Sequence, residues 1–145
     1  MTDAVKLQLA LTELQAFLGD RATDGAVHRM AYSRDWSPRY KDMTDLPDIV
    51  VVPQDTDEVV KLIQVALRYE LPVVPYAGGT GMGGGAVAWK GGIMVETKGM
   101  NRVLEIDPDN MSVTVQAGIT IWELNEHLAS YGLWLPHQPE SKRAC

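Results

Sequence analysis

The residues of this 145-residue chain with the clearest chemical potential are glycines. Most of its 13 glycines fall within residues 78–92, directly after the apolar residues 73–75, and residues 78–86 read Gly-Gly-Thr-Gly-Met-Gly-Gly-Gly-Ala. Without Cβ atoms in the way, successive peptide N–H groups can converge on one anion. Ordering such a loop costs much backbone entropy, so its place beside a strand indicates close approach to a ligand. We predict that the loop binds phosphate.

Other interpretations of the loop differ in what must follow it. Gly79-x-Gly81-x-x-Gly84 matches the dinucleotide fingerprint, but that motif requires a helix to open at the loop. Here residues 86–90 lead through Gly91 and Gly92 into another apolar run, so no helix is expected. A Walker loop is excluded because no glycine precedes a lysine and a hydroxyl residue. A flexible linker stays open, although residues 73–88 contain no serine and no charge.

The segments before the loop predict a strand, a helix and a second strand. Residues 49–52 form a β-branched run typical of a strand buried on both faces. Asp55 and Glu58 indicate a helix start, and the helix is expected to end near Glu70 before a strand at 71–75. Its expected buried stripe consists of Val59, Leu62, Ile63, Ala66 and Leu67. A parallel crossover would place the loop at the carboxyl end of its strand, where ligands bind in open α/β sheets.

The remaining segments predict a smaller antiparallel part. Residues 92–97 indicate a strand, and residues 100–107 and 112–116 a hairpin. Thr120 and Glu123 form a capping box, and Gly132 is expected to cap the end of that helix. The first residues predict a helix that ends at Gly19, and residues 21–45 are expected to be irregular. The fold class is therefore α+β, an α/β unit plus antiparallel strands, with a lead-in at 1–43 and a cofactor domain at 44–145.

Composition excludes several functions. A formal charge of −6 argues against nucleic acid as a partner. The sequence has no apolar run of about 18 residues, so we expect no transmembrane segment. The single cysteine, Cys145, forbids an internal disulfide and favours the cytoplasm. His28, His127 and His137 lack the spacing of a metal site, and we assign no metal ligand and no catalytic residue.

Several motifs together resemble a known family. Besides the loop, they are Pro-x-x-Val-Val-x-Pro at 47–53, Met-Asn-Arg-Val-Leu-Glu-Ile-Asp at 100–107 and Val-Thr-Val-Gln-Ala-Gly at 113–118. The chain resembles the FAD enzymes of the vanillyl-alcohol oxidase and p-cresol methylhydroxylase (PCMH) type, in the branch of glycolate oxidase and the D-lactate dehydrogenases. Tyr-Ser-Arg-Asp at 32–35 also resembles a Tyr-x-x-Asp found upstream in that family. Because family members are much longer, the resemblance implies part of a two-subdomain FAD-binding domain of PCMH type.

The resemblance also implies which residues contact FAD. The diphosphate would lie along residues 76–82, residues 85 and 86 would form an adjoining wall, and residues 139 and 141 would face the ribityl chain and flavin. The full candidate set is Pro75, Tyr76, Ala77, Gly78, Gly79, Thr80, Gly81, Met82, Gly85, Ala86, Gly118, Pro139 and Ser141. Three departures from the family pattern are Tyr76 in place of arginine, Met82-Gly83 in place of Leu-Ser, and Glu140 in place of a small residue.

The implied function is FAD-dependent oxidation of a small 2-hydroxy acid such as glycolate or D-lactate, with an electron-acceptor subunit as a further expected partner. We expect non-covalent FAD, because Thr80 stands where covalent branches carry histidine. The chain alone should bind FAD weakly or not at all and should not turn over substrate. A non-enzymatic anion-binding module and an interaction protein stay open as alternatives. The second would use Trp89, Trp122 or Trp134 as exposed anchors, whereas we expect these side chains in the core.

Overall fold

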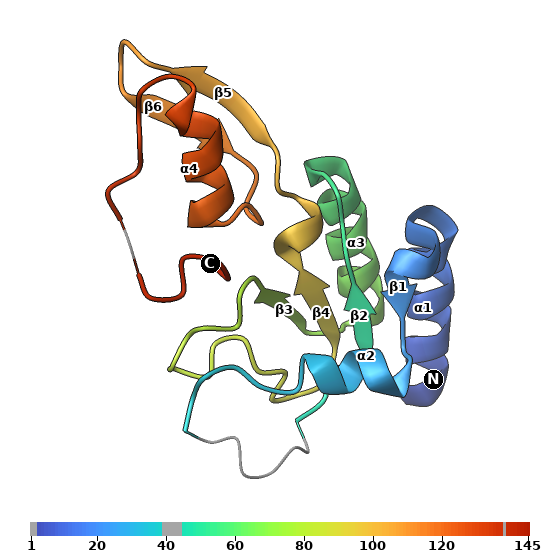
Figure 1. The fold of residues 1–145 in the computed structure, drawn as a ribbon. Helices are drawn as coiled ribbons and strands as arrows, with labels where there is room; N and C mark the ends of the chain where they lie inside the picture. Colours follow the sequence, from blue (N-terminus) through green and yellow to red (C-terminus); the bar gives the residue numbers. More distant parts are fainter. Residues whose placement is uncertain (1–2, 39–44, 138) are drawn as a thin grey trace.

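A computed structural model describes residues 3–38, 45–137 and 139–145 (Figure 1). The helices are α1 (Asp3–Leu18), α2 (Ala26–Ala31), α3 (Thr56–Tyr69) and α4 (Ile121–Ala129), with short 3-10 helices η1 (Gly19–Arg21) and η2 (Thr97–Gly99). The strands are β1 (Ala22–Thr23), β2 (Ile49–Val51), β3 (Val73–Tyr76), β4 (Ile93–Glu96), β5 (Val103–Asp107) and β6 (Ser112–Val115). This mixture of a parallel unit and an antiparallel hairpin confirms the predicted α+β fold.

The larger sheet has the order β1-β2-β4-β3, in which β2, β4 and β3 are parallel and β1 is an antiparallel edge. Every residue of β2 and β4 is buried, as their apolar runs predicted. Successive side chains of a strand point to opposite faces. Ile49 and Ile93 therefore face the core shared with α1 and α3, while Val50 and Met94 face Ala88 and the glycine-rich loop. Helices α1 and α3 cover one face of the sheet, and loop segments lie on the other (Figure 1).

Helix α3 begins as predicted, but its buried face is rotated. The Asp55 Oδ1 accepts a hydrogen bond of 2.9 Å from the Glu58 N–H. Leu62 and Ala66 are buried, whereas the predicted core residues Ile63 and Leu67 are 38% and 73% exposed, and Val65 is buried instead. The reason is α1, which packs along the side of α3 that carries residues 65 and 69. Tyr69 Oη donates to Glu13 Oε1 of α1 at 2.6 Å, which fixes that orientation.

The expectation that residues 21–45 are irregular is wrong for part of that segment. Ala22 and Thr23 form β1 opposite Val51 and Val50, and α2 follows directly. Two residues carry no periodicity, so this strand forms only because the edge of β2 offers it a partner. The Arg21 guanidinium holds both carboxylate oxygens of Glu58 at 2.6 Å and ties this segment to α3. Tyr40, another residue of the predicted irregular segment, lies outside the described residues.

The smaller unit consists of the predicted hairpin β5–β6 and α4, and it lies beyond η2 (Figure 1). The capping box of Thr120 and Glu123 is present, as predicted. Helix α4 ends at Ala129, and the chain then turns at Gly132, which has a φ of +68°. In the described residues, no helix combines the length and the apolarity needed to cross a membrane.

The three tryptophans that we expected in the core are largely exposed, so that expectation is wrong. Trp122 and Trp134 of the smaller unit are 39% and 60% exposed, and Trp89 beside the loop is 44% exposed. A two-stranded sheet and one helix have little interior to offer. Among the residues of α4, only Leu124 and Leu128 are buried.

Candidate functional site

The glycine-rich loop leaves the carboxyl end of β3, as predicted, and returns to the sheet at β4. Residues 77–92 contain turns and bends but no helix. The dinucleotide fingerprint therefore lacks the helix that it requires, so the loop offers a ligand its own backbone and no helix amino end.

The first turn of the loop is held from behind by an aromatic pair. Gly79 has a φ of +63°, and a Cβ at this position would overlap the Tyr76 hydroxyl group. The Tyr76 and Tyr32 rings meet edge to face with centroids 5.0 Å apart, and Tyr76 Oη donates to the Arg34 carbonyl at 3.2 Å. Only glycine combines this backbone conformation with this lack of space.

The segment that holds the loop is the Tyr-Ser-Arg-Asp motif at 32–35 together with the next two residues. The backbone N–H of Trp36 donates to the carbonyl oxygens of both Gly79 and Gly81, at 3.2 and 3.1 Å. Asp35 Oδ1 accepts from the Ser37 N–H at 2.8 Å, which shapes the turn around Trp36. No site residue was expected in this segment, so the contact of Trp36 with the loop was missed. The motif itself was the available signal.

These two hydrogen bonds orient the peptide units of the loop. In a trans peptide the C=O and N–H groups point in opposite directions. Because the Gly79 and Gly81 carbonyls point to Trp36, the N–H groups of Thr80 and Met82 point away from it. Within the described part of the chain, no peptide N–H from residue 78 to residue 85 donates a hydrogen bond to another residue. A run of unpaired N–H groups is a nest that suits a phosphate.

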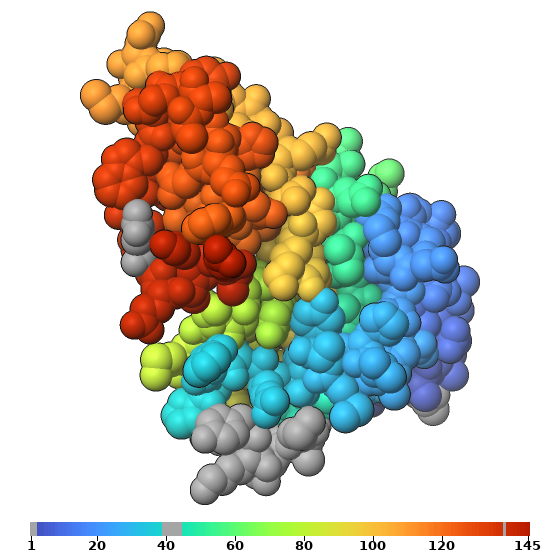
Figure 2. Space-filling view, viewed as in Figure 1, coloured from blue at the N-terminus to red at the C-terminus, as the bar shows by residue number. Residues whose placement is uncertain are grey.

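Beside this nest lies a cleft of ≈ 600 Å³. Its lining residues come from three segments: Trp36, Gly78, Thr80, Met82, Glu140, Ser141 and Ala144. The last residues of the sequence lie against the loop so closely that a Cβ at Gly78 would overlap the Ala144 carbonyl oxygen. Figure 2 shows this segment, in dark red, against the yellow-green loop. The cleft thus brings together four of the predicted contacts, namely Gly78, Thr80, Met82 and Ser141.

The other predicted contacts surround the cleft or lie apart from it. Tyr76 and Gly79 hold the first turn, and Gly81 lies at the tip, while Pro75, Ala77, Gly85 and Ala86 flank the loop without lining the cleft. Gly118 packs on η2, where its N–H donates to the Met100 carbonyl at 2.8 Å and a Cβ would overlap the Thr97 carbonyl oxygen. Packing alone therefore requires glycine at position 118. The Pro139 carbonyl accepts from the Lys142 N–H at 3.1 Å.

The amino end of α4 does not offer a second anion site. The N–H groups of Ile121 and Trp122 donate to the carbonyls of Cys145 and Lys142, at 2.9 and 3.0 Å. The Glu123 N–H donates to the capping Thr120 hydroxyl. The first-turn N–H groups of α4 are therefore paired, unlike those of the glycine-rich loop.

Two buried acidic residues, Asp35 and Glu96, lie near the loop among polar groups. Burial raises the pKa of the Tyr32 phenol, and the hydrogen bond that Tyr32 donates to Glu96 raises it further. Burial also raises the pKa of Tyr76, with Glu96 and Asp35 adding to it. Burial alone would raise the pKa of Asp35, but the Ser37 hydroxyl and the backbone N–H groups of Ser37 and Ala86 outweigh it, and the pKa is lowered. The hydrogen bonds from Ser37 and Ala86 therefore favour the charged form of the Asp35 carboxyl group.

Comparison with known proteins agrees with this geometry. Residues 47–145 match the family model for the FAD binding domain. The chain is 34% identical over 143 residues to glycolate oxidase subunit GlcD of Bacillus subtilis, covering 99% of this chain and 29% of that protein. It is 34% identical over 129 residues to the mitochondrial D-lactate dehydrogenase [cytochrome] of Arabidopsis thaliana, covering 89% of this chain and 23% of that protein. The chain thus spans less than a third of the length of these relatives.

Solved structures give the same result. Alkyldihydroxyacetonephosphate synthase superposes with a TM-score of 0.84 at 29% identity, over 93% of this chain and 29% of that one. p-Cresol methylhydroxylase superposes with a TM-score of 0.85 at 20% identity, over 97% of this chain and 28% of that one, which shows the shared fold. The unpaired N–H groups fit the diphosphate of FAD, and so do Gly81, Gly83 and Gly85, where a Cβ would meet nothing within 4 Å. The chain therefore belongs to the FAD-binding domain family, and its fold is that of the PCMH-type flavoproteins.

Proposed function

We propose that this chain provides the diphosphate-binding part of the FAD site in an oxidoreductase that oxidises a 2-hydroxy acid. The observation that carries the site is the run of peptide N–H groups from residue 78 to residue 85, none of which donates to another described residue. Bound FAD supplies the electron acceptor for such an oxidation. The chain's part is to hold and orient the cofactor.

Each side of the cleft has a distinct task in this proposal. The N–H groups of Thr80 and Met82 bind the diphosphate oxygens, because the hydrogen bonds of the loop carbonyls to Trp36 leave these N–H groups unpaired and turned away from the Trp36 backbone. Hydrogen bonds polarise a peptide unit, so acceptance by the Gly79 carbonyl strengthens the Thr80 N–H as a donor. We assign Ser141, whose Oγ lies 3.0 Å from Cys145 Sγ, to the ribityl chain because it lines the same cleft. Gly85, Ala86 and Pro139 would complete the surroundings, and Gly118 would support the hairpin.

The substrate class rests on the relatives, which include glycolate oxidase and D-lactate dehydrogenase proteins. Glycolate and D-lactate are therefore the first substrates to test, in a protein that contains the rest of the relatives' length. An electron-acceptor subunit and a cytoplasmic location stay predictions, the second resting on the single cysteine.

We propose that FAD is held without a covalent bond. The loop residue that lines the cleft at the candidate linkage position is Thr80, whose hydroxyl is a poor nucleophile toward flavin compared with an imidazole. All flavin should then be released when the protein is precipitated with acid. Flavin absorbance that stays with the polypeptide would contradict this proposal.

A titration followed by NMR tests the site and tolerates weak binding. Adding FAD to ¹⁵N-labelled chain should shift the amide signals of residues 78–85, and ADP should do the same because it carries the diphosphate. Riboflavin, which lacks phosphate, is the matched control and should leave these signals in place. We expect weak affinity, because ordering a glycine-rich loop opposes association. If millimolar FAD moves none of these signals, the proposed site is wrong.

A dye-reduction assay tests the expectation that the chain alone is inactive. No reduction of an artificial acceptor should depend on added glycolate or D-lactate. Substrate-dependent reduction would show that these 145 residues suffice for catalysis.

A further inference from the structure

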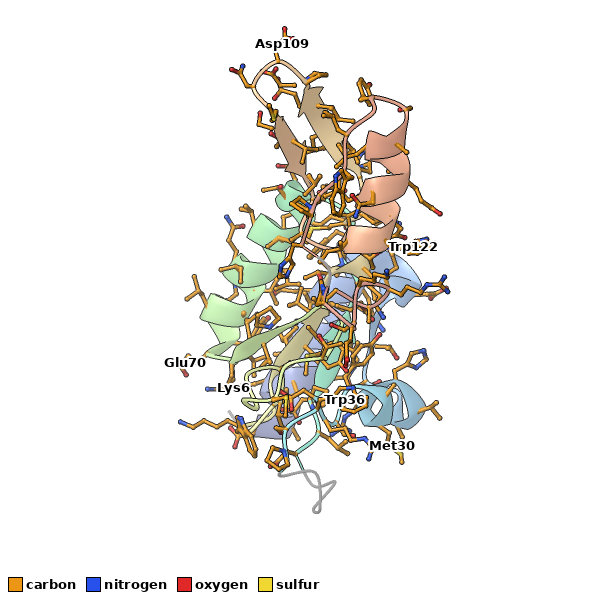
Figure 3. The ribbon with its side chains drawn as sticks, turned by 60° about the vertical axis from the view of Figure 1, so that its left-hand side comes forward. Lys6, Met30, Trp36, Glu70, Asp109 and Trp122 are labelled. Carbon is orange, nitrogen blue, oxygen red and sulfur yellow. The ribbon has the colours of Figure 1, made fainter. Side chains whose placement is uncertain are left out.

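Trp36 is the large aromatic side chain that lines the cofactor cleft. Its side chain is 75% exposed, although the backbone around it is fixed. Its neighbours Asp35 and Ser37 are both buried, and its own N–H is held by the Gly79 and Gly81 carbonyls. Figure 3 labels Trp36 at the level of the glycine-rich loop, well below Trp122 on α4. The chain therefore presents an exposed indole from a rigid support beside the diphosphate nest.

An exposed tryptophan on a rigid backbone is costly unless it has a ligand to cover it. Large apolar side chains lose favourable burial when they remain in water. Within the described part of the chain, the Trp36 indole makes no hydrogen bond and no ring contact. The small side chains of Ser141 and Ala144 leave room in the cleft for a flat ring, and Glu140 adds a carboxylate to the same lining. Met82, which is equally exposed, adds an adaptable apolar surface at the loop tip.

We infer that the Trp36 indole stacks on an aromatic ring of the bound cofactor and so acts as a positioning residue for it. This inference rests on the proposed function. FAD carries such a ring at each end, adenine and isoalloxazine, and both have the flat π-face that stacks on tryptophan. The diphosphate would be fixed by N–H groups, and the indole would fix the direction in which the attached ring leaves the nest.

Trp36 contributes to cofactor binding in two ways that can be separated by experiment. One residue holds the loop through its backbone and touches the cofactor through its side chain. Replacing the side chain leaves the backbone N–H in place, so the two contributions can be separated. A loss of affinity in Trp36→Ala then reports the ring and not the support of the loop.

The test follows the four indole N–H signals of the chain by NMR, the Trp36 signal being the one that Trp36→Phe removes. FAD should shift the Trp36 indole signal together with the loop amides. FMN in place of FAD shifts it if the isoalloxazine stacks, and ADP shifts it if the adenine stacks. Trp36→Ala should weaken FAD binding by roughly tenfold, and Trp36→Phe by less, because phenylalanine retains a stacking face. Trp134→Ala is the matched control, because Trp134 is exposed but does not line the cleft.

Three outcomes are distinguishable. Movement of the Trp36 signal with reduced affinity in Trp36→Ala supports the stacking. In a second outcome, FAD moves the loop amide signals but not the Trp36 indole signal, and Trp36→Ala binds FAD as tightly as the unmodified chain does. The stacking is then wrong and the proposed function stands. If FAD moves neither set of signals, the proposed function and the stacking are both wrong.

Discussion

The glycines of the loop fall into two groups with opposite surroundings. At Gly78, Gly79 and Gly84, which we term the held glycines, a Cβ would meet Ala144, Tyr76 or Trp89. At Gly81, Gly83 and Gly85, the open glycines, a Cβ would meet nothing within 4 Å, and none of the three has a positive φ. The chain's own packing explains the first group. Nothing inside the described chain explains the second, whereas the approach of the proposed FAD diphosphate would.

A glycine in this loop can be required by an unusual φ or by a closely approaching ligand, and Gly79 and Gly81 differ in the first of these. Gly79 has the positive φ, whereas Gly81 does not. The two positions should therefore respond differently to the same substitution.

Gly79→Val should have the largest effect. Valine is strained at a φ of +63°, which costs about 1–3 kcal/mol, and its side chain would displace the Tyr76 ring. The free energy of unfolding in urea should fall, and FAD binding should fall with it. An unfolding midpoint equal to that of the unmodified chain would show that the first turn is not held.

Gly81→Val should affect binding but not stability. The side chain enters open space, so the unfolding midpoint should stay, while the methyl groups stand beside the Thr80 and Met82 N–H groups that the diphosphate needs. We expect FAD affinity to fall by roughly tenfold or more, measured by the same NMR titration. Unchanged affinity would place the phosphate elsewhere.

Lowering the pH should weaken the packing at the held glycine Gly79, because Asp35 shapes the turn that holds it. Burial works to raise the pKa of Asp35, but hydrogen bonds from Ser37 and Ala86 lower the net pKa. Because this pKa is lowered in the folded state, the charged Asp35 carboxylate stabilises the fold at pH values above its unfolded-state pKa. This stabilisation is lost as the pH falls through the folded-state pKa. The NMR chemical shift of the Gly79 amide, followed as the pH is lowered, should therefore show an acid transition. Asp35→Asn should remove this transition. A transition that persists in Asp35→Asn would assign it to another group.

Gly83→Ala should have a small effect on stability, opposite in sign to that of Gly79→Val. Alanine fits an open position with negative φ and restricts the unfolded chain, which stabilises by about 0.4–1 kcal/mol. Thermal unfolding measures this change. A loss of stability would show that Gly83 is held by contacts, contrary to the comparison.

Local patterns in the sequence were sufficient for most of the elements. The β-branched run of β2, the Asp55 cap of α3 and the capping box of α4 each depend on residues close together in the chain, and all three are present. The loop at the carboxyl end of β3 followed from the same patterns, because a parallel crossover fixes where the strand ends. The family was also recognisable, since its motifs are contiguous in sequence.

Contacts between distant segments were decided only by the tertiary structure. The buried face of α3 depends on α1, whose Glu13 lies 56 residues before Tyr69, and no periodicity within α3 contains that contact. β1 exists because β2 has a free edge, and Trp36 reaches the loop because the fold places residues 32–37 beside residues 79–81. The sequence determined that a glycine loop would follow a strand. Which of those glycines the protein needs for its own packing, and which it leaves open to a ligand, depended on atoms that only folding brings together.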